Sequence, residues 1–81
     1  MPKQKGLSGK EMITFFQTQG FSIISHRGSH IKLRRFVSTT KQTLVVPNHK
    51  SIDKGTMKEI YNQARRFLDQ DILNTFFYTE N

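Results

Sequence analysis

The sequence predicts an α+β domain with elements in the order α-β-β-β-α. Capping patterns mark the starts of two helices, and apolar and polar residues alternate along a segment that begins at residue 29. Turn residues separate this segment from an apolar segment on each side. Three strands joined by short turns form an antiparallel sheet, and helices packed on one face leave the other face open.

The first helix is expected to begin after Ser8 and to end before Gly20. Ser8-Gly9-Lys10-Glu11 has the form of a capping box, in which the serine and the glutamate each bind a free backbone N–H. Leu7 and Met12 have the spacing of a hydrophobic staple. Gly20 can adopt the positive φ that follows many helices.

Three strands follow, and we expect them at residues 21–26, 29–37 and 42–47, with turns at 27–28 and 38–41. Gly28 accepts the positive φ that a tight hairpin requires. Pro47 has no N–H to donate and therefore ends the third strand.

A second capping box, Thr56-Met-Lys-Glu59, predicts the start of the second helix after a polar loop over residues 48–55. Its core-facing side chains recur at helical spacing: Met57, Ile60, Tyr61, Ala64 and Leu68. The spacing of apolar residues in 69–78 indicates a further short helix or an extension of the second one. Phe76, Phe77 and Tyr78 form an apolar cluster there, for which a dimer or partner-protein contact is a hypothesis.

The 81 residues are expected to form a single domain. A domain of this size buries roughly 60% of the surface of its unfolded chain, so a substrate must bind on an exposed face. Residues 1–7 are expected to be a mobile lead-in. No apolar segment has the length of a membrane span, and the absence of cysteine fits a cytoplasmic protein, so we expect no membrane association.

The charge is strongly positive and unevenly distributed. Thirteen Lys and Arg against six Asp and Glu give +7, and residues 27–66 hold ten of the basic residues with only Asp53 and Glu59 in opposition. Such a field attracts nucleic acid, an anionic membrane or an acidic protein. An enzyme acting on RNA, a non-catalytic RNA-binding module and an adaptor for an acidic protein are all compatible with it.

The strand expected at residues 29–37 carries the most informative pattern. Because strand side chains alternate between faces, Ile31 and Leu33 can be buried while His30, Lys32 and Arg34 line the other face. A group that titrates near neutrality beside two cations suits a phosphodiester backbone. An ordinary edge strand with a basic solvent face would produce the same pattern.

RNA cleavage on this face would use the 2′-hydroxyl of the substrate. The chain has no cysteine, and its carboxylates and histidines do not have metal-ligand spacing, so we expect no metal and no cofactor. His30 can act in general acid–base catalysis, which typically contributes about 10²–10⁴-fold. Lys32 and Arg34 are candidates for stabilising the developing negative charge.

Five further residues each have a functional and a structural interpretation. Gly28 either contributes to substrate binding or has only a conformational role in the turn, and Ser29 binds either a phosphate or the turn itself. His49 is either a second proton-transfer group or a loop residue, and Lys54 leads either into an anion site at a helix N-terminus or into an ordinary cap. Phe36 shares the face of His30 and either stacks on an unpaired base or flanks the sheet edge.

The chain also resembles the HicA toxins, the messenger-RNA-cleaving partners in HicA–HicB toxin–antitoxin pairs. The resemblance covers residues 8–68 and leaves 69–81 as an additional helical tail. It is carried by four segments in order: Ser8-Gly9-Lys10-Glu11, Gly20-Phe21, Arg27-Gly28-Ser29-His30, and Val46-Pro47-Asn48-His49 through Lys54-Gly55-Thr56. The Gly-Ser-His tripeptide alone is a weak signal, whereas the ordered set is specific.

The resemblance implies a fold like the double-stranded-RNA-binding domain and a metal-independent ribonuclease whose catalytic residue is His30. It implies messenger RNA as substrate and a HicB-like antitoxin that covers the basic face. Family members often have a second histidine after the first and an aromatic residue two positions further on, where this chain has Ile31 and Leu33. A weak homo-oligomer is a further association that we consider.

Overall fold

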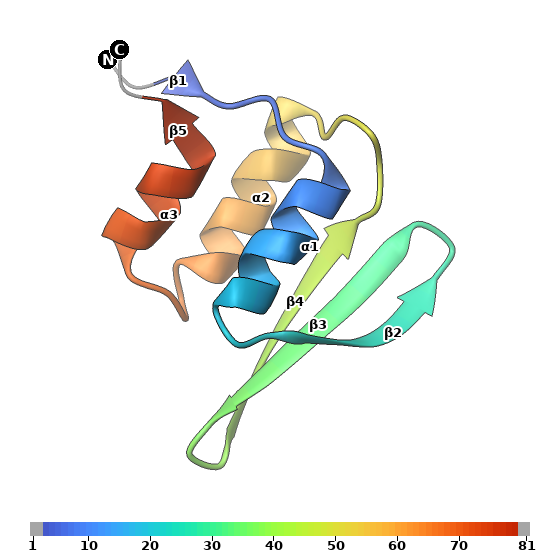
Figure 1. Ribbon diagram of the computed structural model, residues 1–81, viewed down its shortest axis with the longest axis vertical. Coiled ribbons are helices and arrows are strands. Elements are labelled where there is room, and N and C mark those ends of the chain that lie inside the picture. Colours follow the sequence, from blue (N-terminus) through green and yellow to red (C-terminus); the bar gives the residue numbers. More distant parts are fainter. Residues whose placement is uncertain (1–2, 80–81) are drawn as a thin grey trace.

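The computed structural model of the chain describes residues 3–79. In this range the elements are β1 (Lys3–Gln4), α1 (Gly9–Thr18), β2 (Ser22–Arg27), β3 (His30–Val37), β4 (Thr40–Pro47), α2 (Lys54–Ala64), α3 (Gln70–Phe77) and β5 (Tyr78–Thr79). Strands β2, β3 and β4 form an antiparallel sheet with β3 in the centre. The helices lie together on one side of this sheet (Figure 1). The predicted α+β architecture, like that of a double-stranded-RNA-binding domain, is confirmed.

Helix α1 begins as its sequence predicts. The Ser8 N–H donates to Glu11 Oε1 at 2.9 Å, and the Glu11 N–H donates to Ser8 Oγ at 3.1 Å, which completes the capping box. Leu7 and Met12, the two members of the expected staple, are both buried. Gly20 has φ +94° directly after the C-cap, as expected of the residue that ends the helix.

Helix α2 begins earlier than predicted. Its N-cap is Asp53, whose carboxylate accepts the Thr56 N–H at 3.1 Å, so the predicted start at Thr56 is wrong. The reason is that aspartate is at least as good an N-cap as threonine, and Asp53 stands three residues upstream. Hydrogen bonds from the Thr56 hydroxyl and backbone N–H hold the pKa of Asp53 below its usual value of 3.8.

The sheet register is regular along β3 and β4, from His30 opposite Pro47 to Val37 opposite Thr40. Strand β4 begins two residues earlier than expected, because Ser38 adopts φ +55° and closes a tighter turn than the sequence indicates. The register of β2 with β3 shifts between Ile23 and Ser25.

One core joins the inner face of the sheet to all three helices. Its fully buried side chains come from α1 (Met12, Phe16), the sheet (Leu33, Leu44, Val46), α2 (Met57, Ile60, Ala64) and α3 (Leu73, Phe77). Phe76 stacks on Phe15 with ring centroids 4.0 Å apart. Phe77 is buried, whereas Phe76 and Tyr78 are half-buried against the core. The domain therefore covers the C-terminal aromatic cluster in part, and a dimer or partner contact there stays a hypothesis.

The lead-in differs from the expectation of a mobile segment. Strand β1 pairs with β5, with Lys3 opposite Thr79 and Gln4 opposite Tyr78. The Lys5 N–H donates to Phe77 O at 2.8 Å, because the end of α3 leaves backbone acceptors free. Residues 1 and 2 of the expected lead-in lie outside the described residues. No helix within residues 3–79 is long and apolar enough to cross a membrane.

Candidate nucleic-acid interface

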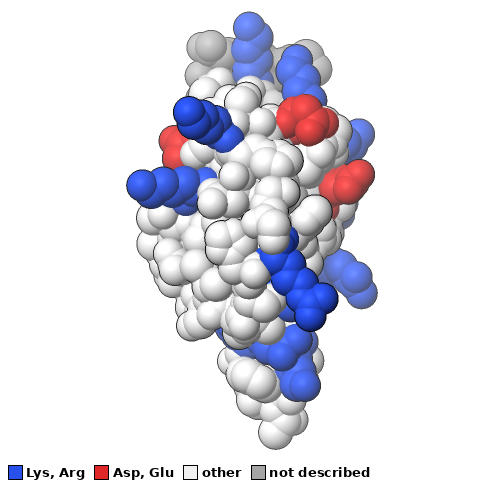
Figure 2. Space-filling view, turned by 90° about the vertical axis from the view of Figure 1, so that its right-hand side faces the viewer, with Lys and Arg blue, Asp and Glu red and all other residues white. Residues whose placement is uncertain are grey.

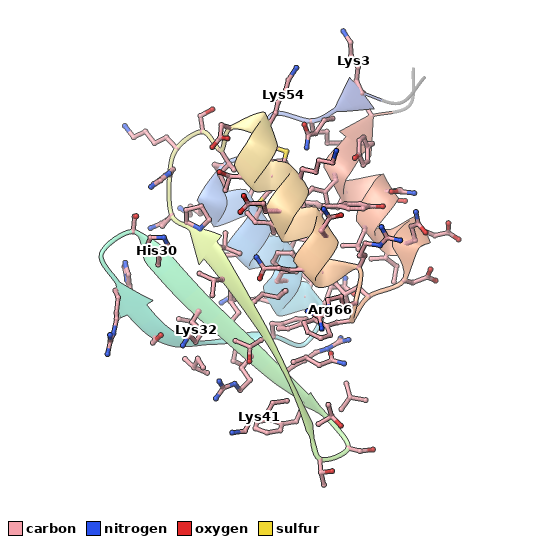
Figure 3. The ribbon with its side chains drawn as sticks, turned by 180° about the vertical axis from the view of Figure 1, so that it is seen from behind. Lys3, His30, Lys32, Lys41, Lys54 and Arg66 are labelled. Atoms are coloured by element: carbon pink, nitrogen blue, oxygen red, sulfur yellow. The ribbon has the colours of Figure 1, made fainter. Side chains whose placement is uncertain are left out.

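The two faces of β3 differ as the alternation predicts. Ile31 and Leu33 point into the core and are 3% and 0% exposed. His30 and Lys32 are exposed on the opposite, uncovered face, and Arg34 is half-buried there. Figure 3 shows His30 and Lys32 along the same strand. Ile31 and Leu33, at which the sequence departs from the pattern of the family it resembles, are therefore core positions in this chain.

A shallow depression of about 430 Å³ surrounds His30 on the uncovered face. It receives side chains from all three strands of the main sheet: Ile24, Ser25 and Arg27 of β2, His30, Lys32 and Arg34 of β3, and Val45 of β4. The structure thus brings His30, Lys32 and Arg34 together, as the sequence predicts.

Arg27 and Ser25 belong to this depression although the sequence did not single them out as site residues. Arg27 is the cross-strand partner of His30, and Ser25 is the partner of Lys32. Cross-strand partners point to the same face, so the register of the β2–β3 hairpin identifies Arg27 and Ser25 as neighbours of His30 and Lys32. The sequence predicted the turn at 27–28, whereas β2 extends to Arg27 and the turn is at 28–29, so the expected register did not pair Arg27 with His30.

Arg34 is held in place on this face by its neighbour on β4. Its Nε donates to Thr43 Oγ1 at 3.0 Å. Arg34 and Thr43 are also cross-strand partners in the regular β3–β4 ladder. A guanidinium fixed in this way loses little side-chain entropy when it binds a phosphate.

Arg35, the next residue, points to the helices and has a structural role. Its guanidinium donates to Gln42 Oε1 at 2.6 Å, to Gln19 O at 2.8 Å and to Phe67 O at 2.9 Å. Its carbon Cζ also lies 4.8 Å from the centroid of the Phe21 ring. One side chain therefore ties the end of α1 and the turn after α2 to the sheet.

The β2–β3 turn is joined to the end of β4. Gly28 has φ +56°, and Ser29 O accepts the Asn48 N–H at 2.6 Å. His49 follows, and its backbone oxygen accepts the Gly9 N–H at 2.8 Å. The His49 side chain is exposed and does not line the depression. The geometry thus gives the His49 backbone an anchoring role, and the His49 side chain is not part of the lining of the depression.

Lys54 lies apart from the depression. It is the first residue of α2, and Figure 3 shows its side chain directed away from His30 and Lys32. The Asp53 carboxylate already accepts an N–H of the first turn of this helix. The ordinary cap is therefore the interpretation that the geometry supports at this helix end.

The charge on the surface is asymmetric. On the side drawn in Figure 2, Asp and Glu appear only in the upper half, whereas Lys and Arg extend into the lower half, toward the β3–β4 hairpin. Residues 3–79 contain no group of three or more His, Asp or Glu side chains arranged to hold a metal ion.

A family model, the HicA toxin of bacterial toxin–antitoxin systems, matches residues 9–65. The match is well over half of the chain and contains α1, the three-stranded sheet, α2 and every residue that lines the depression. No curated protein and no solved structure matches the chain.

Proposed function

This chain belongs to the HicA toxin family of bacterial toxin–antitoxin systems, and from that membership we propose that it is an endoribonuclease that cleaves messenger RNA through His30. The observation that supports the proposal is the depression on the uncovered sheet face. There an exposed histidine lies among Arg27, Lys32 and Arg34. A general base beside cations suits metal-independent phosphodiester cleavage, because the base can take up a proton while the cations stabilise the developing negative charge.

The proposed reaction uses the substrate's own nucleophile. His30 takes the proton from a ribose 2′-hydroxyl, the 2′-oxygen forms a bond to phosphorus, and the bond from phosphorus to the 5′-oxygen breaks. The products are a 2′,3′-cyclic phosphate and a 5′-hydroxyl, and the departing oxygen takes up a proton. His49 stays our candidate for that second proton donor. The reaction needs no metal or cofactor, and DNA is not cut because it lacks the 2′-hydroxyl.

The basic side chains stabilise the charge that develops on the phosphorane. The side chains of Lys32 and Arg27 are exposed and can adjust to the position of the phosphate. Arg34 is oriented in advance by its hydrogen bond to Thr43. A donor aimed at developing charge typically contributes about 10²–10³-fold to kcat. Gly28 and Ser29 place the turn beside the scissile phosphate, and Lys54 contributes to general attraction of the RNA.

We further propose that a HicB-like antitoxin inhibits the protein by covering the basic sheet face. The depression is shallow and open, so a partner laid across the sheet would exclude RNA from His30. Acidic side chains on that partner would complement the cations of the face.

The first test compares the wild type with His30→Ala on a long unstructured RNA in the presence of EDTA. We expect cleavage that leaves 2′,3′-cyclic phosphate ends, and a loss of at least about 10²-fold in rate for His30→Ala. His26→Ala is the matched control, because His26 is also exposed on the sheet but pairs with Ile31, on the other face from His30.

Two results would contradict the proposal. Equal cleavage by the wild type and His30→Ala would remove His30 from the reaction. RNA binding without cleavage by either protein would instead identify a non-catalytic RNA-binding module on the same fold.

A further inference from the structure

We propose that Phe36 is a stacking platform for one unpaired base of a single-stranded RNA that runs along β3 toward His30. The inference rests on the proposed use of the uncovered sheet face for RNA and adds to it a second contact point, remote from the scissile bond. It assigns Phe36 and Lys41 to a nucleotide-binding subsite at the end of the β3–β4 hairpin.

The face of Phe36 follows from its neighbours on β3. Leu33 is fully buried in the core, and Arg35 donates to Gln19 O and Phe67 O on the helix side. The β3–β4 register has no shift from His30 to Val37, so the alternation is unbroken. Phe36 therefore points to the same uncovered face as His30, Lys32 and Arg34.

Phe36 differs from every other phenylalanine of the chain. Phe16, Phe21 and Phe77 are buried, and Phe15, Phe67 and Phe76 pack against the core. Phe36 alone stays outside the core and is 62% exposed. Phe36 is the last residue but one of β3, and the β3–β4 hairpin extends beyond the helices (Figure 1).

The surroundings of the ring favour RNA over a protein partner. The cross-strand partner of Phe36 is Lys41, and the next residue along its face on β3 is Arg34. Figure 3 shows Lys41 near the end of the hairpin. Val37, the other exposed apolar side chain here, points to the opposite face, so the two do not form one continuous apolar patch.

A ring flanked by cations suits a nucleotide, because the base stacks on the ring while its phosphates lie near the cations. The ring can reach only a base that is free of its complement, so the subsite selects single-stranded RNA over duplex RNA. Phe36 is six positions after His30, which is about 20 Å along a strand. The stacked base is therefore several nucleotides from the scissile phosphate.

The test measures binding in the His30→Ala background, so that the RNA stays intact. Phe36→Ala should weaken binding of a short unstructured RNA by roughly 10- to 100-fold, the range that loss of one base–aromatic stack produces. Phe36→Trp should restore binding. Val37→Ala is the matched control, since it shortens a neighbouring apolar side chain that is also exposed, at 48%, but on the other face, and it should leave binding unchanged.

A second measurement locates the base. Abasic substitutions are placed one at a time along the RNA, and binding to the His30→Ala protein that keeps Phe36 is measured for each. At one position the abasic RNA should bind this protein as weakly as the intact RNA binds the Phe36→Ala variant. At that position Phe36→Ala should cause no further loss, because the two changes remove the same contact. Circular dichroism melting shows that each variant is folded.

The outcomes separate this inference from the proposed function. Unchanged RNA affinity in Phe36→Ala would overturn the stacking platform, even if the wild type cleaves RNA. A wild type that does not cleave, together with weakened binding in Phe36→Ala, would support the platform and overturn the catalytic proposal. Loss of affinity for a partner protein, with RNA affinity intact, would assign Phe36 to a protein interface and overturn the inference.

Discussion

Gly9 shows how a single residue controls the distance between two elements. Its N–H donates to His49 O, and the start of α1 lies directly against the loop after β4. A Cβ atom at this position would collide with Pro47 O and would come within 2.8 Å of Asn48 Cα. Both neighbours are backbone, so the contact can be relieved only by moving the loop away from the helix.

We therefore expect Gly9→Ala to lower the free energy of unfolding by about 1–3 kcal/mol or more, the usual cost of overpacking. Gly6→Ala is the control, because a Cβ at Gly6 meets nothing within 4 Å. Chemical denaturation of both variants measures the difference. Equal stability of the two would show that the loop moves at little cost.

Arg34 and Arg35 show that identical side chains can have separate roles. Alternation places them on opposite faces of β3, where Arg34 meets the depression and Arg35 binds two backbone carbonyls of the helical layer. The count of basic residues in the sequence includes both. Only the structure shows that the Arg35 guanidinium forms hydrogen bonds within the domain.

At the scale of elements, α3 belongs to the core although it lies outside the family match. Leu73 and Phe77 are fully buried, and Phe76 stacks on Phe15. Truncation at Asp69 would remove these contacts and unfold the domain. Loss of partner binding in such a truncation would therefore report loss of the fold and not loss of a docking surface.

We expect Leu73→Ala to reduce the free energy of unfolding by about 2–5 kcal/mol, the range for large-to-small changes in a core. Ile72→Ala serves as the matched control because Ile72 is 40% exposed on the same helix. Thermal melting followed by circular dichroism compares the two. Similar melting temperatures would contradict the central position of α3.

The sequence predicted those elements whose signals are local. The capping box at Ser8 and the alternation at Ile31 and Leu33 depend on neighbouring residues, and both are confirmed. Asp53 and Thr56 are three residues apart, and both are suitable N-cap residues. The local pattern favoured Thr56, whereas the N-cap of α2 is Asp53. Arg27 was missed as a lining residue because its proximity to His30 depends on strand register.

At the scale of the whole molecule, the net charge of +7 should set much of the strength of the proposed RNA binding. Each cation that neutralises a phosphate releases condensed counterions, so affinity falls as salt rises. The slope of that fall counts the phosphate contacts.

In the His30→Ala background we expect Lys32→Ala to reduce the slope of log affinity against log salt by about 0.7, the value for one contact on a single strand. Lys10→Ala is the control, because Lys10 lies on α1, in the helical layer behind the sheet. Fluorescence anisotropy titrations at several salt concentrations give both slopes. An unchanged slope for Lys32→Ala would show that Lys32 does not neutralise a phosphate of the bound RNA.

The pairing of β1 with β5 has a consequence for biosynthesis. Lys3 is the partner of Thr79, and Phe77 is one of the fully buried side chains of the core. A nascent chain lacks this pairing and that part of the core until residues through Thr79 have left the ribosomal exit tunnel. We therefore expect the domain to reach its full stability only after residues through Thr79 have emerged, and the proposed nuclease activity to begin no earlier than that.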